Sequence, residues 1–269
     1  MRLLVVVPAI ALVTLILIPV QWFAVRFDLP LKRGLPVFYH RIVCRLIGIR
    51  ITVVGARITE HPLMIVSNHV SWADISIITS VAPVVFIAKS EVGRWPIFGM
   101  LSKLQRSVFV DRSRRHKTGE VNAEIAQRLA GGDPVLLFGE GTSSDGNRVL
   151  AFRSALIGAA RDALAEAEHA GRVWIQPLSL AYTGMLGLPL GRKYRPLIAW
   201  YGDFDLFTHL VRALRIGTFD VTVTWGEPVP FDENSNRKNV TRELEAAVRR
   251  MTTLALRGQV SAPQAAQGR

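Results

Sequence analysis

The chain has 269 residues, of which 49% are hydrophobic, and it carries a formal net charge of +12 at pH 7. This length suffices for one α/β domain with an appendage. The single cysteine, Cys44, excludes a disulfide framework and a cysteine-based metal site. A basic and apolar chain indicates an anionic membrane, an acidic carrier protein or a nucleic acid as partner.

The N-terminal segment, residues 3–25, is almost wholly apolar and has no charge between Arg2 and Arg26. It predicts a helix that spans or deeply enters a bilayer. A cleaved signal peptide is the competing interpretation, but no small-x-small cleavage site follows. The positive charges that follow it, Arg26, Lys32 and Arg33, place the downstream chain in the cytoplasm.

A second apolar stretch, residues 35–49, has Arg41 and Arg45 on one helical face. The pattern predicts an amphipathic helix at the membrane interface, or else a surface helix of the globular domain. Residues 1–49 are therefore expected to form a membrane anchor.

One globular domain is predicted over residues 50–257, before a polar tail, residues 258–269, that is expected to be disordered. Short apolar runs alternate with helical periodicity, which predicts an α/β fold: a mixed, largely parallel sheet flanked by helices. Strands are expected at 51–54, 63–67, 84–88, 107–110, 134–138, 173–182 and 219–225. Helices are expected at 71–83, 112–129, 154–169 and 239–256. The apolar segment 95–101 lines an acyl-chain tunnel, touches the bilayer or forms a buried short helix.

The first chemical stretch follows the strand predicted at 63–67. His69 lies in a strand-to-helix turn, and Ser71 with Asp74 forms a capping-box pattern. The positive end of the helix disfavours protonation, so we expect a neutral imidazole that acts as a general base. Asp74 would fix its tautomer. The same residues are equally consistent with a helix cap and a turn histidine.

Two further stretches follow later strands. Gly139, Glu140, Gly141 and Thr142 form a glycine-rich turn whose N–H groups could bind an anion or an oxyanion. No Gly-Lys-Ser/Thr follows, so it is not a P-loop. Arg112 ends the strand at 107–110 and suits a grip on phosphate or carboxylate, or a surface ion pair with its neighbour.

Taken together and in chain order, these stretches resemble the glycerolipid acyltransferase family, whose type member is the bacterial lysophosphatidic acid acyltransferase. The family carries an Asn-His-x4-Asp block, a strand ending in arginine, a Phe-Pro-Glu-Gly-Thr-Arg block and an apolar strand with a proline. The matching stretches here are Asn68-His69 with Asp74, and residues 109–112, 138–142 and 175–178. The resemblance implies that residues 50–257 form an acyltransferase domain.

Two departures bear on the acceptor. Gly139 replaces the proline and is expected only to loosen the turn, whereas Ser143 replaces an arginine that in the family helps hold the acceptor's phosphate. Residues 143–148 and 199–206 resemble the subgroup that acylates lyso-ornithine lipid, whose zwitterionic head group has no phosphate. Arg112 or Arg148 remains available for a phosphate or for the head-group carboxylate.

The resemblance implies an O-acyltransferase of the bacterial inner membrane whose catalytic domain faces the cytoplasm. It would move an acyl chain from acyl carrier protein or coenzyme A to a lysolipid, expected to be lyso-ornithine lipid, with 1-acyl-sn-glycerol-3-phosphate as the alternative. His69 and Asp74 are expected to be catalytic. The remaining site residues are substrate-binding Arg112, Glu140, Gly141, Thr142 and Arg148, and supporting Asn68, Gly139 and Ser143.

No metal or cofactor is implied, and the partners expected are the lysolipid, the acyl donor and an anionic membrane. A nucleic acid is disfavoured because the basic run at 112–117 lacks interleaved aromatic residues. A thioesterase that uses water as acceptor would share the same histidine and aspartate chemistry. A non-enzymatic membrane protein that keeps the fold is disfavoured by the presence of His69, Asp74 and Glu140.

Overall fold

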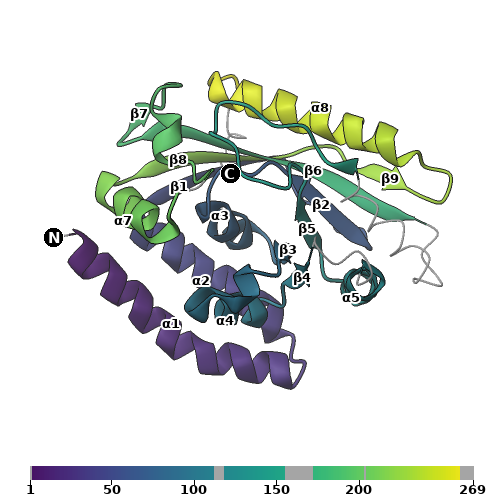
Figure 1. The fold of residues 1–269 in the computed structure, drawn as a ribbon, viewed down its shortest axis with the longest axis horizontal. Helices are drawn as coiled ribbons and strands as arrows, with labels where there is room; N and C mark the ends of the chain where they lie inside the picture. The colour runs from purple at the N-terminus through teal and green to yellow at the C-terminus, as the bar shows by residue number, and fades with distance from the viewer. Residues whose placement is uncertain (1, 112–117, 155–171, 203, 261–269) are drawn as a thin grey trace, which may run out of the picture.

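Among the described residues, nine strands form one sheet, with the strand order β1-β8-β6-β2-β5-β3-β4 and two short strands, β7 and β9, beside β6. The computed structural model describes residues 2–111, 118–154, 172–202 and 204–260 (Figure 1). The strands are β1 Ile49–Val54, β2 Leu63–Ser67, β3 Val85–Lys89, β4 Val108–Val110, β5 Val135–Phe138, β6 Val173–Met185, β7 Leu188–Pro189, β8 Phe219–Trp225 and β9 Val229–Phe231. Every pairing is parallel except those of β6 with β7, β8 and β9.

The described helices lie on both faces of this sheet. They are α1 Arg2–Arg26, α2 Leu31–Ile47, α3 Ala73–Val81, α4 Pro96–Leu104, α5 Thr118–Ala130, α7 Leu206–Ile216 and α8 Arg237–Leu256, with 3-10 turns at Val92–Arg94 and Arg195–Leu197. In Figure 1, α8 covers one face, and α1, α2, α3 and α7 lie on the other. The expected mixed, largely parallel α/β fold is confirmed.

Side-chain alternation along the strands creates two hydrophobic cores, one on each face of the sheet. In β2, Leu63 and Ile65 join a core with α2, α3 and α7, whereas Met64 and Val66 join a core with α5 and α8. All four side chains are buried, as expected for a central parallel strand that is covered on both faces. β2 is therefore a rigid support for the residues that follow it.

Most predicted elements lie within a few residues of their expected bounds. The helix predicted from Ser71 begins at Ala73, and that predicted from 35 begins at Leu31. The segment 95–101 does form a short helix, α4, but its side chains Ile97, Phe98 and Met100 are exposed rather than buried. α7 was not predicted, although Asp205 caps it and accepts a hydrogen bond from the Thr208 N–H group.

The two N-terminal helices pack against the globular body. α2 contacts both α1 and α3, and buries Val43, Cys44 and Ile47 in the core. The Cys44 thiol is free, and burial raises its pKa to about 12, as expected for a small buried hydrophobic residue. α1 is long and apolar enough to cross a membrane, and most of its surface faces away from the protein. The predicted helix 154–169 and the predicted tail lie almost entirely outside the described residues.

Candidate active site

The site lies at the carboxyl ends of two neighbouring parallel strands. The register pairs Ser67 of β2 with Phe138 of β5, so the two turns that follow these strands begin side by side. The Gly139 N–H group continues the ladder by donating to the Ser67 carbonyl at 2.9 Å. In open α/β sheets, such strand ends form the crevice in which ligands bind. The turn that carries His69 and the glycine-rich turn after Phe138 are therefore brought together by strand register.

His69 and Asp74 form a hydrogen-bonded pair. His69 Nδ1 lies 2.8 Å from Asp74 Oδ2, and because a carboxylate only accepts, Nδ1 carries the proton. In the neutral ring the lone pair is then on Nε2, the nitrogen that a general base uses. The imidazole stacks on the Phe138 ring at 3.9 Å, and its side chain is 17% exposed. The ring is thus held in place by β5 while it remains accessible to a substrate.

Asp74 is fully buried and receives four hydrogen bonds. Oδ2 also accepts from the backbone N–H groups of Val70 at 2.6 Å and Ser71 at 2.9 Å, and Oδ1 accepts from the Tyr182 hydroxyl at 2.7 Å. The carboxylate half of the predicted capping box therefore forms, but the N-cap residue of α3 is Trp72, which makes no side-chain cap hydrogen bond. Asp74 organises the turn as well as orienting the imidazole.

Tyr182 is the site residue that sequence reasoning missed. It lies on β6, 108 residues after Asp74, and burial together with the Asp74 charge raises its pKa well above its usual value. The hydroxyl therefore stays protonated and acts as a donor to the carboxylate. No local spacing signals this partner, because only the pairing of β6 with β2 brings it close.

Asn68 ties the turn to the sheet. Its side-chain amide donates to the Leu180 carbonyl at 2.9 Å and accepts from the Leu180 N–H group at 2.8 Å. The two bonds mimic a strand pairing just beyond the end of β2. From the other side, the Ser144 N–H group donates to the His69 carbonyl at 2.8 Å. His69 is thus held between β6 and the loop that follows β5.

Glu140 is a second buried carboxyl group at this site, and only 2% of it is exposed. Among the described residues, neither oxygen has a hydrogen bond of normal geometry. Burial raises its pKa to about 8 and the Asp74 charge adds to the rise, while the backbone N–H groups of Leu150 and His69 oppose it. At pH 7 the carboxyl group is therefore mainly protonated, and it can both donate and accept a hydrogen bond.

The glycine-rich turn is more constrained than the sequence suggested. A side chain at Gly139 would lie 2.7 Å from the ring of Phe152, so this glycine makes room for an aromatic residue rather than loosening the turn. The N–H groups of Gly139 and Gly141 donate to the carbonyls of Ser67 and Phe138. These two expected anion donors are already engaged inside the protein.

The remaining predicted residues lie at the rim or outside the described part. Thr142 and Arg148 are exposed in the loop after β5, and Arg112 falls outside the described residues. Ser143, which stands where the resembled family has arginine, donates from its hydroxyl to the Trp200 carbonyl. Trp200 in turn donates from its backbone N–H group to the Val70 carbonyl at 2.9 Å. The position of the missing arginine is therefore occupied by a short bridge between two loops of the site.

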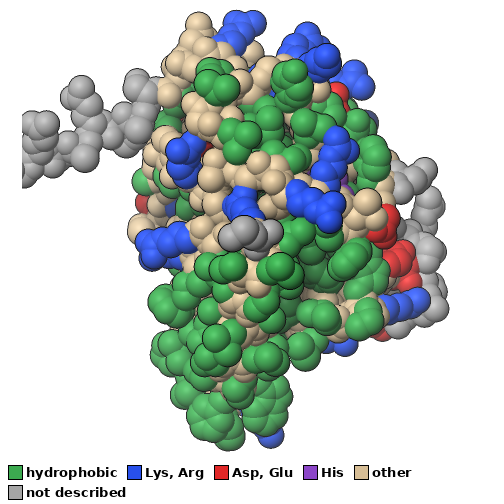
Figure 2. Space-filling model, turned by 90° about the vertical axis from the view of Figure 1, so that its left-hand side faces the viewer, with side chains coloured by type: hydrophobic (Ala, Val, Ile, Leu, Met, Phe, Trp, Pro, Cys, Tyr) green, Lys and Arg blue, Asp and Glu red, His purple; other side chains and the backbone are tan. Residues whose placement is uncertain are grey.

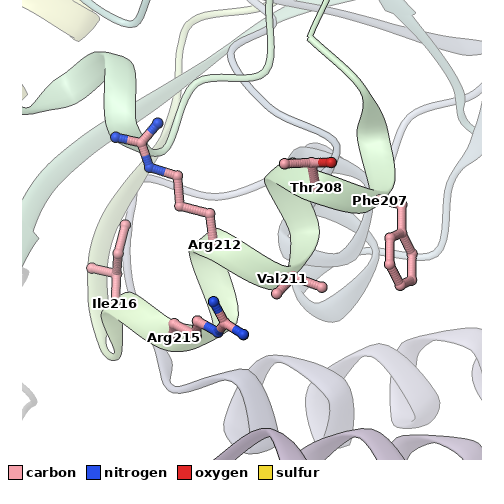
Figure 3. Close-up of a pocket in the computed structure, with 6 residues that line it drawn as sticks. All are labelled: Phe207, Thr208, Val211, Arg212, Arg215 and Ile216. Carbon is pink, nitrogen blue, oxygen red and sulfur yellow. The ribbon is translucent and has the colours of Figure 1, made fainter.

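A surface recess of about 460 Å³ lies on α7, apart from these residues (Figure 3). Its lining residues are Phe207, Thr208, Val211, Arg212, Arg215 and Ile216. It contains none of the predicted site residues and combines apolar and arginine side chains on one exposed helix face. This composition is typical of a contact with a charged interface rather than of a reaction centre.

Comparisons with known proteins agree with the motifs. A family model described as Acyltransferase matches residues 50–181. The chain is 49% identical to the lyso-ornithine lipid O-acyltransferase of Brucella abortus, over 96% of each chain. It is 46% identical to the lyso-ornithine lipid O-acyltransferase of Rhizobium meliloti, over 93% of this chain and 85% of that protein.

The names of two more distant matches state a different acceptor. The chain is 30% identical to a 1-acyl-sn-glycerol-3-phosphate acyltransferase of Neisseria meningitidis, over 73% of this chain and 72% of that protein. Its fold is similar to the crystal structure of the 1-acyl-sn-glycerophosphate acyltransferase of Thermotoga maritima, with a TM-score of 0.55 at 20% identity, over 94% of this chain and 99% of that chain. This structural match concerns the fold alone.

Proposed function

The chain belongs to the glycerolipid acyltransferase family and is an enzyme that acylates a lysolipid; we propose that its acceptor is lyso-ornithine lipid and its product ornithine lipid. One observation carries the choice of acceptor. Ser143 provides no cation where the family has a phosphate-binding arginine, and its hydroxyl is bonded to the Trp200 carbonyl. The printed names of the two relatives at 49% and 46% identity support the same acceptor.

In the proposed reaction, His69 Nε2 accepts the proton of the acceptor hydroxyl while that oxygen attacks the thioester carbonyl carbon. The carbon–sulfur bond then breaks, and the thiolate leaves with the proton that His69 carries. Asp74 keeps the imidazole in the required tautomer and stabilises its positive charge. The enzyme returns to its starting state without a covalent intermediate, and the proposed steps use no metal or cofactor.

The loop after β5 is proposed to bind the reacting groups. Protonated Glu140 would donate a hydrogen bond to a substrate oxygen, with Gly141 and Thr142 beside it. Arg148, which is exposed, and Arg112, whose role is predicted from the sequence, would hold the phosphate of the donor's phosphopantetheine arm or the acceptor's head group. The donor is proposed to be acyl carrier protein or coenzyme A, and the net charge of +12 would attract either anionic partner.

We propose that α1 lies lengthwise in the cytoplasmic leaflet of the inner membrane. Both of its ends contact the body: Arg2 donates to the Ile47 carbonyl, and Gln21 donates to the Leu104 carbonyl at 2.9 Å. Figure 2 shows hydrophobic side chains gathered over the lower part of one face, with most Lys and Arg above them. Arg212 and Arg215 on α7 would then meet anionic head groups.

The acceptor is tested by a side-by-side transfer assay on membranes that contain the protein. Acyl carrier protein thioester or acyl-coenzyme A is supplied with either lyso-ornithine lipid or 1-acyl-sn-glycerol-3-phosphate. We expect acylation of lyso-ornithine lipid, and an activity at least about 10²–10⁴-fold lower for His69→Ala. Exclusive acylation of the phosphate acceptor would overturn the acceptor assignment, and normal turnover by His69→Ala would overturn the mechanism.

The membrane arrangement is tested with one introduced cysteine, since native Cys44 is buried. Leu4→Cys lies near the N-terminal end of α1, and it should not react with a membrane-impermeant maleimide that is added on the side opposite the cytoplasm. Labelling from the opposite side would show that α1 spans the bilayer.

A further inference from the structure

Arg195 is a buried cation that the proposed reaction has not used. It begins the 3-10 turn Arg195–Leu197, and 9% of it is exposed. Nη1 donates to Asn147 Oδ1 at 3.3 Å, while Nε has no hydrogen-bond partner among the described residues. A buried guanidinium normally satisfies its five donors, because an unsatisfied one is costly. Arg195 is therefore suited to a further acceptor from outside the protein.

The side chain is held next to the turn that carries His69. It bonds to the loop after β5, where the Ser144 N–H group donates to the His69 carbonyl. A side chain at Gly146 would lie 3.2 Å from Val70 and 3.7 Å from the Cβ atom of Arg195. Because Val70 directly follows His69, Arg195 lies close to the catalytic turn.

The charges around Arg195 favour an anion. Burial lowers its pKa and so does neighbouring Arg192, while Asp145 is the acid that opposes them. Asp145 is itself engaged, because it accepts from the N–H group and the side-chain amide of Asn147 at 3.0 Å and 3.2 Å. Ser143, in the same loop, contributes no charge. An anionic substrate group would supply the missing neutralisation.

We propose that Arg195 binds the carboxylate of the lysolipid head group, with Asn147 orienting the guanidinium. The inference rests on the proposed acceptor. A planar guanidinium matches the two oxygens of a carboxylate and forms short, charge-assisted hydrogen bonds with them. Arg195 would thus supply from a different loop the cation that position 143 lacks. A phosphate presents similar anionic oxygens, so the experiment must distinguish a carboxylate acceptor from a phosphate acceptor.

The test compares lyso-ornithine lipid with its carboxamide, in which the head-group carboxylate is a neutral amide. The wild type should have a KM for the carboxamide about 10–100-fold above that for the acid. Arg195→Gln should raise the KM for the acid by a similar factor and no longer distinguish the two acceptors. The KM for the acyl donor should stay unchanged, and Arg195→Lys should restore part of the preference.

Arg192→Gln is the matched control, since Arg192 is an exposed arginine of the same loop. It should keep the preference for the acid, and thermal unfolding of each variant reports folding. A variant Arg195→Gln that still prefers the acid as the wild type does would overturn the inference, whatever its stability. If the wild type acylates only 1-acyl-sn-glycerol-3-phosphate, the acceptor assignment and this inference fail together. If it acylates lyso-ornithine lipid without preferring the acid, the inference alone fails.

Discussion

Two buried carboxyl groups stand at the ends of neighbouring strands, and they differ in how the protein satisfies them. Asp74, after β2, receives hydrogen bonds from His69, Val70, Ser71 and Tyr182. Glu140, after β5, has no bond of normal geometry among the described residues, and its pKa is raised to about 8. A fully bonded carboxylate fixes geometry, whereas a buried carboxyl group without such bonds keeps its proton to a higher pH.

The largest expected effect is from Asp74→Asn, which removes the charge but keeps the shape. The amide NH₂ group would face donors, so one hydrogen bond becomes unfavourable and the His69 tautomer is no longer fixed. We expect a loss of about 10²–10⁴-fold in kcat, measured by acyl transfer at saturating lysolipid. Asp220→Asn is the control, because its ion pair with Arg50 lies on the surface and contributes little. Equal activity of the two variants would show that Asp74 is only a helix cap.

Glu140→Gln tests the other carboxyl group through pH. The folded-state pKa, about 8, lies above the usual 4.5, so the folded protein keeps a proton that the unfolded chain loses between these values. The stability that this group contributes is full below pH 4.5 and is lost as the pH rises through 8. Glutamine does not titrate, so the thermal stability of Glu140→Gln should exceed that of the wild type by a margin that grows from pH 6 to pH 9.

The size of this effect follows from the shift. One pKa unit corresponds to about 1.4 kcal/mol, so the difference should reach on the order of 2 kcal/mol or more at pH 9. Parallel pH dependence of wild type and Glu140→Gln in differential scanning fluorimetry would show that Glu140 is ionised in the folded protein.

Tyr182→Phe sharpens the comparison, because it removes a hydrogen-bond donor from Asp74 and so makes its surroundings more like those of Glu140. The variant removes one donor from a buried carboxylate, which should cost about 1–3 kcal/mol of unfolding free energy. We expect kcat to fall by about tenfold, since His69 keeps its own bond to Asp74. Tyr201→Phe, from a half-buried tyrosine outside this network, is the control. If Tyr182→Phe is as stable and active as Tyr201→Phe, the hydrogen bond from β6 has no role.

The smallest expected effect is from Gly139→Ala, which tests the turn that carries Glu140. The added methyl group would meet the Phe152 ring and should cost about 1–3 kcal/mol through overpacking. Combining it with Phe152→Leu should recover part of the loss, because a smaller side chain leaves room. Additive losses in the double variant, measured by thermal unfolding, would argue against this contact.

The local pattern of the chain predicted most strands and the central motif, because these depend on neighbouring residues. An apolar run leads into His69, and the five-residue spacing to Asp74 places both groups on one turn. The same approach missed α7, whose apolar residues Leu206, Leu210, Ala213 and Leu214 have helical spacing after a capping aspartate. That signal was present in the sequence, so α7 was predictable. The burial of Glu140 was not, because it depends on elements far along the chain.

By itself, the sequence determined which groups can carry the chemistry: a histidine with a nearby carboxylate, a glycine-rich turn with an acid, and an apolar N-terminal helix. These are properties of short segments, where spacing and residue type decide the outcome. Only the tertiary structure decided that Tyr182 bonds to Asp74, that Phe152 occupies the space beside Gly139 and that Arg195 lies beside the catalytic turn. Those contacts join residues that strand pairing and packing bring together, and no local pattern encodes the distance between them.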